Sequence, residues 1–129
     1  MDETWLDPDT QVEWAAHKSS ESLPFAEIET YINQLNRDGY AGHEDWRCPD
    51  IKELISLIDF GRAAPAMRQE VPFRDEDAYW SITPSAKNKT MAWYVDFHFG
   101  FVHFNVQDND FLVRAVRGGR SSQRILARD

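Results

Sequence analysis

Asp96 and His103 are the two residues of this chain whose types and spacing come nearest to acid–base chemistry. A two-residue turn at Phe99-Gly100 would join two strands and set the carboxylate directly opposite the imidazole. Such a pair can transfer protons during a reaction. Because no nucleophile and no set of metal ligands accompanies it in the sequence, we expect a structural ion pair instead.

Other catalytic and metal-binding motifs are missing from the sequence. The four histidines show no i, i+4 spacing, and a single cysteine cannot build a structural zinc site. The oxygen-rich run Asp108-Asn109-Asp110 could bind a hard cation weakly, but it joins two predicted strands and is expected to be a turn. There is no Gly-x-Ser-x-Gly elbow and no phosphate-binding glycine loop. We therefore predict no catalytic residue, no cofactor and no metal.

The same hairpin predicts a surface for contact with a partner. Phe99 would stand at its tip, where tight turns need positive φ angles that a bulky aromatic residue disfavours. Two alternatives follow: an exposed contact surface shared with Phe101, or a longer loop that folds Phe99 back inside. One face of this hairpin is entirely apolar and is expected to lie in the core, with Trp93, Val95, Phe97, Val102, Phe104 and Val106.

The long segment from Arg62 to Glu76 is the second predicted contact region. Pro65 and Pro72 prevent regular structure across it. A loop of this length is either functional or held in place by an aromatic plug at Phe73. Together with the hairpin tip it supplies the candidate partner-binding residues, which are Phe99, Phe101, Arg62, Arg68 and Phe73.

The spacing of apolar residues predicts the elements that would position these side chains. Gly39 ends a first helix, and Asp50 with Glu53 forms a capping box for a second helix that ends near Asp59. The predicted elements are a short hairpin over residues 5–14, helices over 23–37 and from 51, and strands over 79–82, 91–98, 101–107 and 111–117.

Composition and charge narrow the class of protein. The 129 residues, 42% of them hydrophobic, suit one globular domain. The formal net charge of −8 argues against direct binding to nucleic acid, since phosphate contacts need Lys and Arg. Cys48 is the single cysteine, so no intrachain disulfide can form, as is typical where thiols stay reduced. The sequence has no signal peptide and no run of 18 apolar residues, and we expect a cytoplasmic protein without a membrane span.

Three motifs in the last two thirds of the chain resemble those of one family. They are Asp45-Trp46-Arg47-Cys48-Pro49-Asp50 followed by Leu54, then Tyr79-Trp80-Ser81-Ile82-Thr83, then Val113-Arg114-Ala115-Val116-Arg117-Gly118-Gly119. Their order and wording are similar to the Lcl C-terminal-like domain, a bacterial family that resembles the C-type lectin fold. The resemblance implies an α+β fold that is C-type-lectin-like, with two helices packed on a twisted, mostly antiparallel sheet. The chain ends would come together near the first hairpin.

The resemblance also implies domain limits and structural residues. Residues 1–119 would form a single domain, followed by a basic C-terminal tail at 120–129. Arg47, Arg114 and Arg117 match the family wording and are expected to hold the fold through salt bridges. The family typically carries a pair of cysteines, and Ala115 stands at the place of one of them.

Four functions remain open at this point. The leading hypothesis is a non-enzymatic recognition module that binds a protein partner inside the cell. An acidic inhibitor or decoy, phage- or defence-related, that occludes a basic surface is an alternative motivated by the charge of −8. The resemblance implies a carbohydrate-binding, adhesin-like module as a further alternative. The last is an enzyme that uses Asp96 and His103 as an acid–base pair. The identity of the partner and the oligomeric state stay open.

Overall fold

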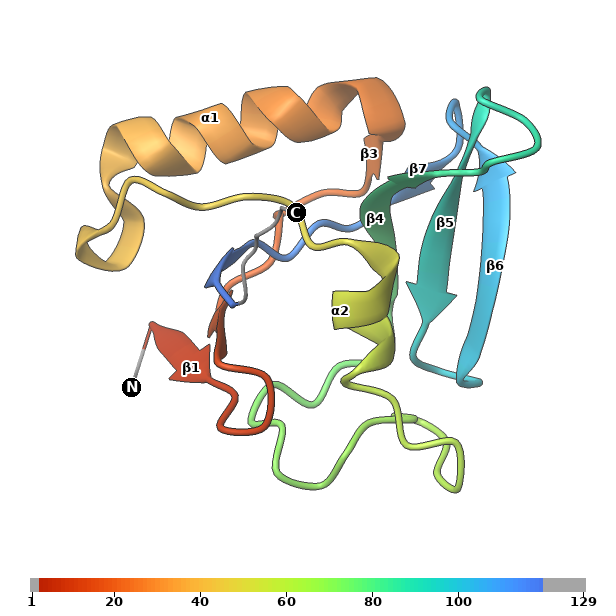
Figure 1. Cartoon of the computed structure of the whole chain (residues 1–129), viewed down its shortest axis with the longest axis horizontal. Coiled ribbons are helices and arrows are strands. Elements are labelled where there is room, and N and C mark those ends of the chain that lie inside the picture. Colours follow the sequence, from red (N-terminus) through yellow and green to blue (C-terminus); the bar gives the residue numbers. More distant parts are fainter. Residues whose placement is uncertain (1–2, 120–129) are drawn as a thin grey trace, which may run out of the picture.

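The structure, a computed structural model, describes residues 3–119 as an α+β arrangement. Within that range, two α-helices and eight short strands are present, and the strands form three antiparallel sheets. The longer helix lies along one side of the molecule, and a three-stranded sheet borders another side (Figure 1). The predicted basic tail at 120–129 lies outside the described residues.

The first sheet joins the two ends of the described chain. Strands β1 (Thr4–Leu6) and β2 (Val12–Ala15) form the predicted hairpin, with Trp5 opposite Trp14. Strand β8 (Val116–Gly118) pairs with the other edge of β2. The expected meeting of the chain ends beside the first hairpin is therefore confirmed for residues 3–119.

Helix α1 (Ile28–Asp38) starts later than the sequence pattern predicts. The two residues before it form strand β3 (Leu23–Pro24), which pairs with β7 (Asp110–Phe111), and a 3-10 turn at Phe25–Glu27 follows. Apolar spacing alone cannot reveal this start, because the extended backbone is held by a strand far away in the sequence. The predicted end is confirmed, since Gly39 takes the left-handed conformation with a φ of 63°. A second 3-10 turn spans Tyr40–Gly42.

Helix α2 (Ile51–Ile55) has the predicted capping box but is only five residues long. The amide of Glu53 donates to Asp50 Oδ1 over 2.8 Å, and the amide of Asp50 donates to Glu53 Oε1 over 3.0 Å. The predicted end near Asp59 is wrong. The chain leaves the helix after Ile55 because Ile58 forms a β-bridge with Met67.

The third sheet contains β4 (Ala78–Pro84), β5 (Met91–Asp96) and β6 (Phe101–Val106), in that order. Asp96 lies opposite Phe101, and His103 lies opposite Tyr94, so the predicted register is wrong by two residues. The turn contains four residues, 97–100, and not two. Only Gly100 takes a positive φ there (83°), which removes the demand for a left-handed phenylalanine.

The apolar face of this hairpin is preserved because a two-residue shift keeps every side chain on its own face. Its burial is uneven. Val95 and Phe97, near the turn, are buried, whereas Phe104 and Val106 are exposed. The expectation that the whole face is core is therefore wrong, because β6 is the outer strand of its sheet.

The interior divides into two hydrophobic clusters. One cluster lies around Trp14, Leu54 and Phe97, and includes residues of α2, β2 and the third sheet. The other gathers Ile28, Trp46 and Trp80 beneath α1. Cys48 belongs to this second cluster, where burial raises the pKa of its thiol. It behaves as a small hydrophobic residue, as its position in the sequence predicts.

Candidate functional site

The turn between β5 and β6 packs against the start of the long loop. The amide of Ala64 donates to the carbonyl of His98 over 2.9 Å, and that of Ala66 donates to the carbonyl of Phe97 over 2.7 Å. A Cβ atom at Gly100 would come within 2.8 Å of Ala66 Cβ. Two regions that the sequence analysis treated separately are therefore joined at one corner of the molecule.

Asp96 shapes the turn and does not pair with His103. Its Oδ1 atom accepts from the amide of His98 over 2.7 Å and from the amide of Phe99 over 3.2 Å. The amide of Gly100 donates to the carbonyl of Asp96 over 2.9 Å. The predicted pair is wrong because it depended on a two-residue turn. Nδ1 of His103 instead donates to the carbonyl of Phe104 over 2.8 Å.

An aromatic surface results from this turn. Phe99 is 69% exposed and Phe101 is 40% exposed, and their rings lie nearly parallel with centroids 6.3 Å apart. The ring of His98 meets Phe99 edge-on at 4.4 Å, and His98 Nδ1 lies 2.7 Å from Glu76 Oε1. The turn is longer than two residues, as the second alternative for Phe99 requires, but the side chain points outward and does not fold back inside. Contact with a partner stays a prediction.

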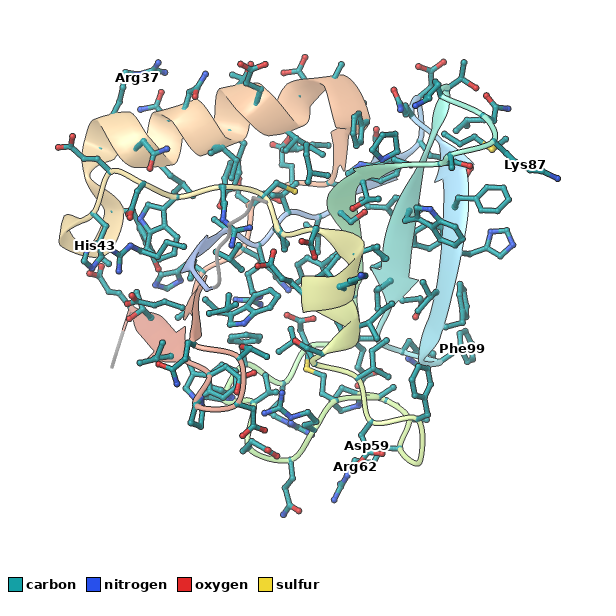
Figure 2. All side chains as sticks on the ribbon, viewed as in Figure 1. Arg37, His43, Asp59, Arg62, Lys87 and Phe99 are labelled. Carbon is teal, nitrogen blue, oxygen red and sulfur yellow. The ribbon has the colours of Figure 1, made fainter. Side chains whose placement is uncertain are left out.

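Arg62 is at the same corner. In Figure 2 the side chains of Asp59 and Arg62 lie next to the end of the hairpin that carries Phe99. The guanidinium of Arg62 pairs with Asp59 Oδ2 over 3.1 Å and donates to Gln69 Oε1 over 3.1 Å. Both partners of this ion pair are exposed.

Phe60 is an exposed residue of this corner that the sequence analysis missed. Its side chain is 69% exposed, and it lies between Asp59 and Gly61 in the same loop. In the sequence, Phe60 is an aromatic residue followed by Gly61 shortly after the second helix. That pattern indicates the end of a helix and also an exposed aromatic side chain. We call Phe60, Arg62, Phe99 and Phe101 the tip surface.

Arg68 is engaged in contacts that stabilise the fold. Its guanidinium pairs with both carboxylate oxygens of Asp7, at 2.9 and 3.2 Å, and donates to the carbonyl of Ser56 over 2.8 Å. Asp7 is fully buried. Burial by itself would raise the pKa of Asp7, but the hydrogen bonds from Arg68 and the Asp9 amide, with the charge of Arg68, lower it below its ordinary value.

Phe73 is the aromatic plug of the long loop. Its ring contacts Trp5 edge-on at 6.0 Å and Trp14 at 6.2 Å. The guanidinium carbon of Arg114 lies 3.9 Å above the ring centroid of Phe73, which is a close cation–π contact.

Arg114 itself is buried and fully engaged. It donates to the carbonyls of Ala15 and Ala16 over 2.9 and 2.7 Å, and it pairs with Asp75 Oδ2 at 2.6 Å. The hydroxyl of Tyr79 donates to the same Asp75 oxygen over 2.6 Å. We call Phe73, Asp75, Tyr79 and Arg114 the Arg114 centre.

Arg47 and Arg117 have the structural role that the resemblance implied. Arg47 forms a two-pronged pair with Glu53, with nitrogen–oxygen distances of 2.8 and 2.7 Å. Arg117 contacts Glu13 Oε1 at 2.5 Å and Asp45 Oδ1 at 2.6 Å. A hydrogen bond from Arg117 lowers the pKa of Asp45. These pairs join β8 to the loop before α2 and to β2.

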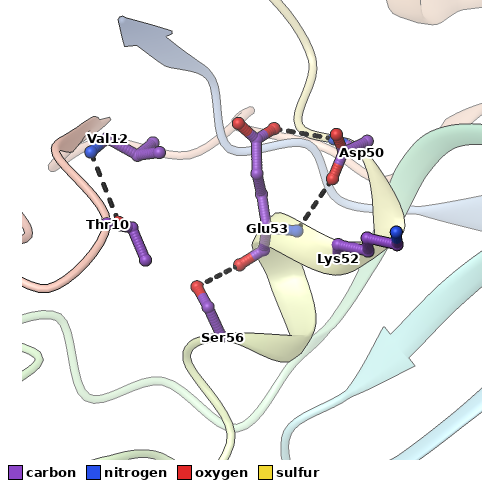
Figure 3. Close-up of a pocket in the computed structure, with 6 residues that line it drawn as sticks. All are labelled: Thr10, Val12, Asp50, Lys52, Glu53 and Ser56. Carbon is purple, nitrogen blue, oxygen red and sulfur yellow. Dashed lines mark hydrogen bonds between the residues drawn. The ribbon is translucent and has the colours of Figure 1, made fainter. Parts of the chain in front are cut away.

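A recess of about 520 Å³ lies above α2. It is lined by Thr10, Val12, Asp50, Lys52, Glu53 and Ser56. Figure 3 shows that several of its polar groups bond to one another: Ser56 Oγ donates to the carbonyl of Glu53, and the Asp50–Glu53 capping box occupies both carboxylates. The recess is thus built from groups that cap the helix and anchor Arg47.

Two further properties of the described residues bear on function. Between residues 3 and 119, no three His, Cys, Asp or Glu side chains gather closely enough to hold a metal ion. No helix in that range is long and apolar enough to cross a lipid bilayer.

Comparison with known proteins identifies the family. The family model described as the Lcl C-terminal domain matches residues 3–117, which is nearly all of the described chain. The chain therefore belongs to the Lcl C-terminal domain family. No curated protein matches the sequence.

Proposed function

We infer that this domain is a non-enzymatic recognition module that binds a protein partner through the tip surface. The observation that carries the inference is the exposed pair of Phe99 (69%) and Phe101 (40%), whose rings lie nearly parallel, together with the exposure of Phe60 (69%) in the adjoining loop. Contiguous exposed apolar area on a soluble domain marks an interaction site, and aromatic side chains with arginine are enriched in interfaces. Arg62 supplies the arginine.

The construction of the tip supports the same inference. Asp96 fixes the turn with two hydrogen bonds, and Ala64 and Ala66 tie it to the loop. An aromatic side chain on a fixed backbone loses little conformational entropy when it binds. We take the scaffold to be C-type-lectin-like, an arrangement in which a rigid body presents variable loops.

We place the protein inside the cell. The support is chemical: Cys48 is buried and its thiol pKa is raised, so it has little thiolate to oxidise or to cross-link. Small exported domains commonly depend on disulfides, and the sequence has no second cysteine with which to form one.

Affinity capture with matched variants tests the proposal. Wild-type chain, the Phe99→Ala/Phe101→Ala variant and a Leu6→Ala control are each immobilised and exposed to lysate of the source organism. Leu6 is an exposed apolar residue on β1 and does not belong to the tip surface. Its replacement therefore controls for nonspecific binding to exposed apolar side chains. We expect a protein captured by wild type and by the control to be lost from the double variant. Capture that is equal for all three chains would overturn the proposal.

Salt dependence separates the proposal from the acidic-decoy alternative. The affinity of a partner that binds the aromatic tip should change little between low and high salt, because salt does not screen apolar contacts. A decoy that depends on the charge of −8 would lose affinity steeply as salt rises. The decoy function replaces the proposed one if moderate salt releases the purified partner and if the partner binds the double variant as tightly as wild type.

A further inference from the structure

Strand β6 is an outer strand with an exposed, uncharged edge. It pairs with β5 alone among the described strands and borders one side of the molecule in Figure 1. Phe104 is 37% and Val106 is 41% exposed. The sequence Phe101–Val106 contains no Lys, Arg, Asp, Glu, Pro or Gly. Natural outer strands usually carry such residues because they prevent pairing with another strand.

The direction of the backbone groups follows from the ladder. The amide of Gln107, directly after β6, donates to the carbonyl of Thr90, directly before β5, over 3.0 Å, so the amide of Gln107 faces the β5 side. Residues of an antiparallel strand alternate between facing the partner and facing away. The amides and carbonyls of Val102, Phe104 and Val106 therefore point away from β5.

Some of these outward groups are satisfied locally. The carbonyl of Phe104 accepts from Nδ1 of His103 over 2.8 Å, and the amide of Val106 donates to Oδ1 of Asn105 over 2.7 Å. The carbonyl of Val106 accepts from the amide of Asn109 over 3.1 Å. Within residues 3–119, both backbone groups of Val102 and the amide of Phe104 have no hydrogen-bond partner. The open part of the edge is thus confined to two residues.

We propose that β6 pairs with β6 of a second copy of this chain, antiparallel and about a two-fold axis at His103. Val102 of one copy then faces Phe104 of the other, and each pair exchanges two hydrogen bonds. This register uses the open groups of both residues, and in each copy it disturbs one local bond, from His103 to the Phe104 carbonyl. A continuous six-stranded sheet results. The inference does not depend on the proposed function.

Two observations favour a second copy over an unrelated strand. The outward groups complement themselves: in a copy turned by 180°, the open carbonyl of Val102 faces the open amide of Phe104, and the open amide of Val102 faces the Phe104 carbonyl, whose local donor is His103. The strand also carries no formal charge, so this pairing places no like charges opposite each other although the chain carries −8 overall. Because strand pairing alone buries a small area, the dimer is of the weak, transient class.

Sedimentation velocity of the full chain over a concentration series, from about 10 μM to about 1 mM, tests the proposal. We expect a dimer that grows with concentration in wild type. The same series measured by amide hydrogen exchange should show protection of Val102 and Phe104 rising with the dimer fraction. The amide of Tyr94, on the inner strand β5, should stay protected at every concentration.

Two lysine substitutions supply a matched comparison. Phe104→Lys and Leu6→Lys each replace an exposed apolar residue on an outer strand and each change the net charge equally. We expect the first to weaken the dimer by at least about tenfold and the second to leave it unchanged. A chain that is monomeric throughout the series would overturn the proposal. So would a dimer in which the Val102 and Phe104 amides of wild type gain no protection, a readout that needs no variant to fold.

Discussion

The Arg114 centre and the tip surface both combine an arginine with aromatic side chains, yet their surroundings differ. Arg114 is 3% exposed and bonds two carbonyls, a carboxylate and a tyrosine hydroxyl, with an aromatic ring against its face. Arg62 is exposed and holds one carboxylate and one amide. Residue type alone therefore does not distinguish an arginine that stabilises the fold from one that we propose to bind a partner. The difference lies in how many of the donors of each guanidinium are already used by the fold.

The aromatic residues divide in the same way. Phe73 is partly buried and contacts Trp5, Trp14 and Arg114, so much of its ring is already covered by the fold. Phe99 has its ring in solvent and contacts His98 and Phe101 alone among the aromatic contacts of the described chain. A ring that is held by such contacts has less surface left for a partner than the exposed ring of Phe99. The two regions should therefore respond oppositely to substitution, one in stability and the other in binding.

Replacement of Arg114 should have the largest effect. Arg114→Leu removes the guanidinium partner of Asp75 and the side-chain donor to the carbonyls of Ala15 and Ala16, which should lower the free energy of unfolding by about 3–5 kcal/mol. Chemical denaturation monitored by fluorescence measures the loss. Arg62→Leu is the matched control at the tip and should change stability by less than about 0.5 kcal/mol. Equal losses in the free energy of unfolding would show that Arg62 stabilises the fold as much as Arg114 does.

The Asp7–Arg68 pair should produce a smaller, pH-dependent effect. Asp7→Asn should lower the free energy of unfolding by roughly 2–3 kcal/mol at neutral pH, because the buried pair loses its negative member. The folded pKa of Asp7 is lowered, so its contribution is complete above the unfolded pKa of about 3.9 and is lost as pH falls through the folded pKa.

The stability difference between wild type and Asp7→Asn should therefore be constant above about pH 5 and should shrink below about pH 4. Denaturation at a series of pH values measures it. Glu13 and Asp45 also have lowered pKa values, but they are present in both chains and cancel in the difference. A difference that does not depend on pH would show that the charge of Asp7 contributes nothing.

The fold was predictable wherever a local rule determines the backbone. Gly39 ended α1 and the Asp50–Glu53 capping box began α2 as the sequence indicates. The start of α1 was not predictable, because the pairing of Leu23 with Phe111 depends on a strand 88 positions later. The hairpin register was wrong for another reason. Alternation fixes which face a side chain takes, but a shift of two residues leaves every face unchanged.

The candidate site was predictable in part for a related reason. The sequence placed Phe99 at the end of a hairpin, but turn chemistry left its exposure open, and the predicted two-residue turn is wrong. Arg68 and Phe73 were assigned to the same surface, but each lies against a residue distant in the sequence, Asp7 and Arg114. Whether these two residues serve a partner as well remains a prediction. Composition gives no information about contacts of that kind.

Substitutions of Asp96 test how the backbone of the turn is held, without changing the exposed aromatic side chains of the tip surface. Asp96→Ala removes the acceptor for the amides of His98 and Phe99 and should cost roughly 1–2 kcal/mol of stability. Asp96→Asn keeps a side-chain oxygen in place and should recover much of that loss. Thermal unfolding of both variants measures the effect. If Asp96→Ala matches wild type, the turn is not held by this carboxylate.

The smallest expected effect on stability belongs to Phe99. Phe99→Ala removes a ring that is 69% exposed, so the free energy of unfolding should change by less than about 0.5 kcal/mol. Phe97, two positions earlier in the same turn, is 1% exposed and packs on Tyr79, and Phe97→Ala should cost about 3–5 kcal/mol. The two variants delete the same atoms from one turn, so denaturation midpoints compare burial alone. A loss for Phe99→Ala as large as that for Phe97→Ala would mean that the Phe99 ring supports the fold. The tip would then be stabilised by its aromatic residues, and partner binding through them could no longer be separated from folding.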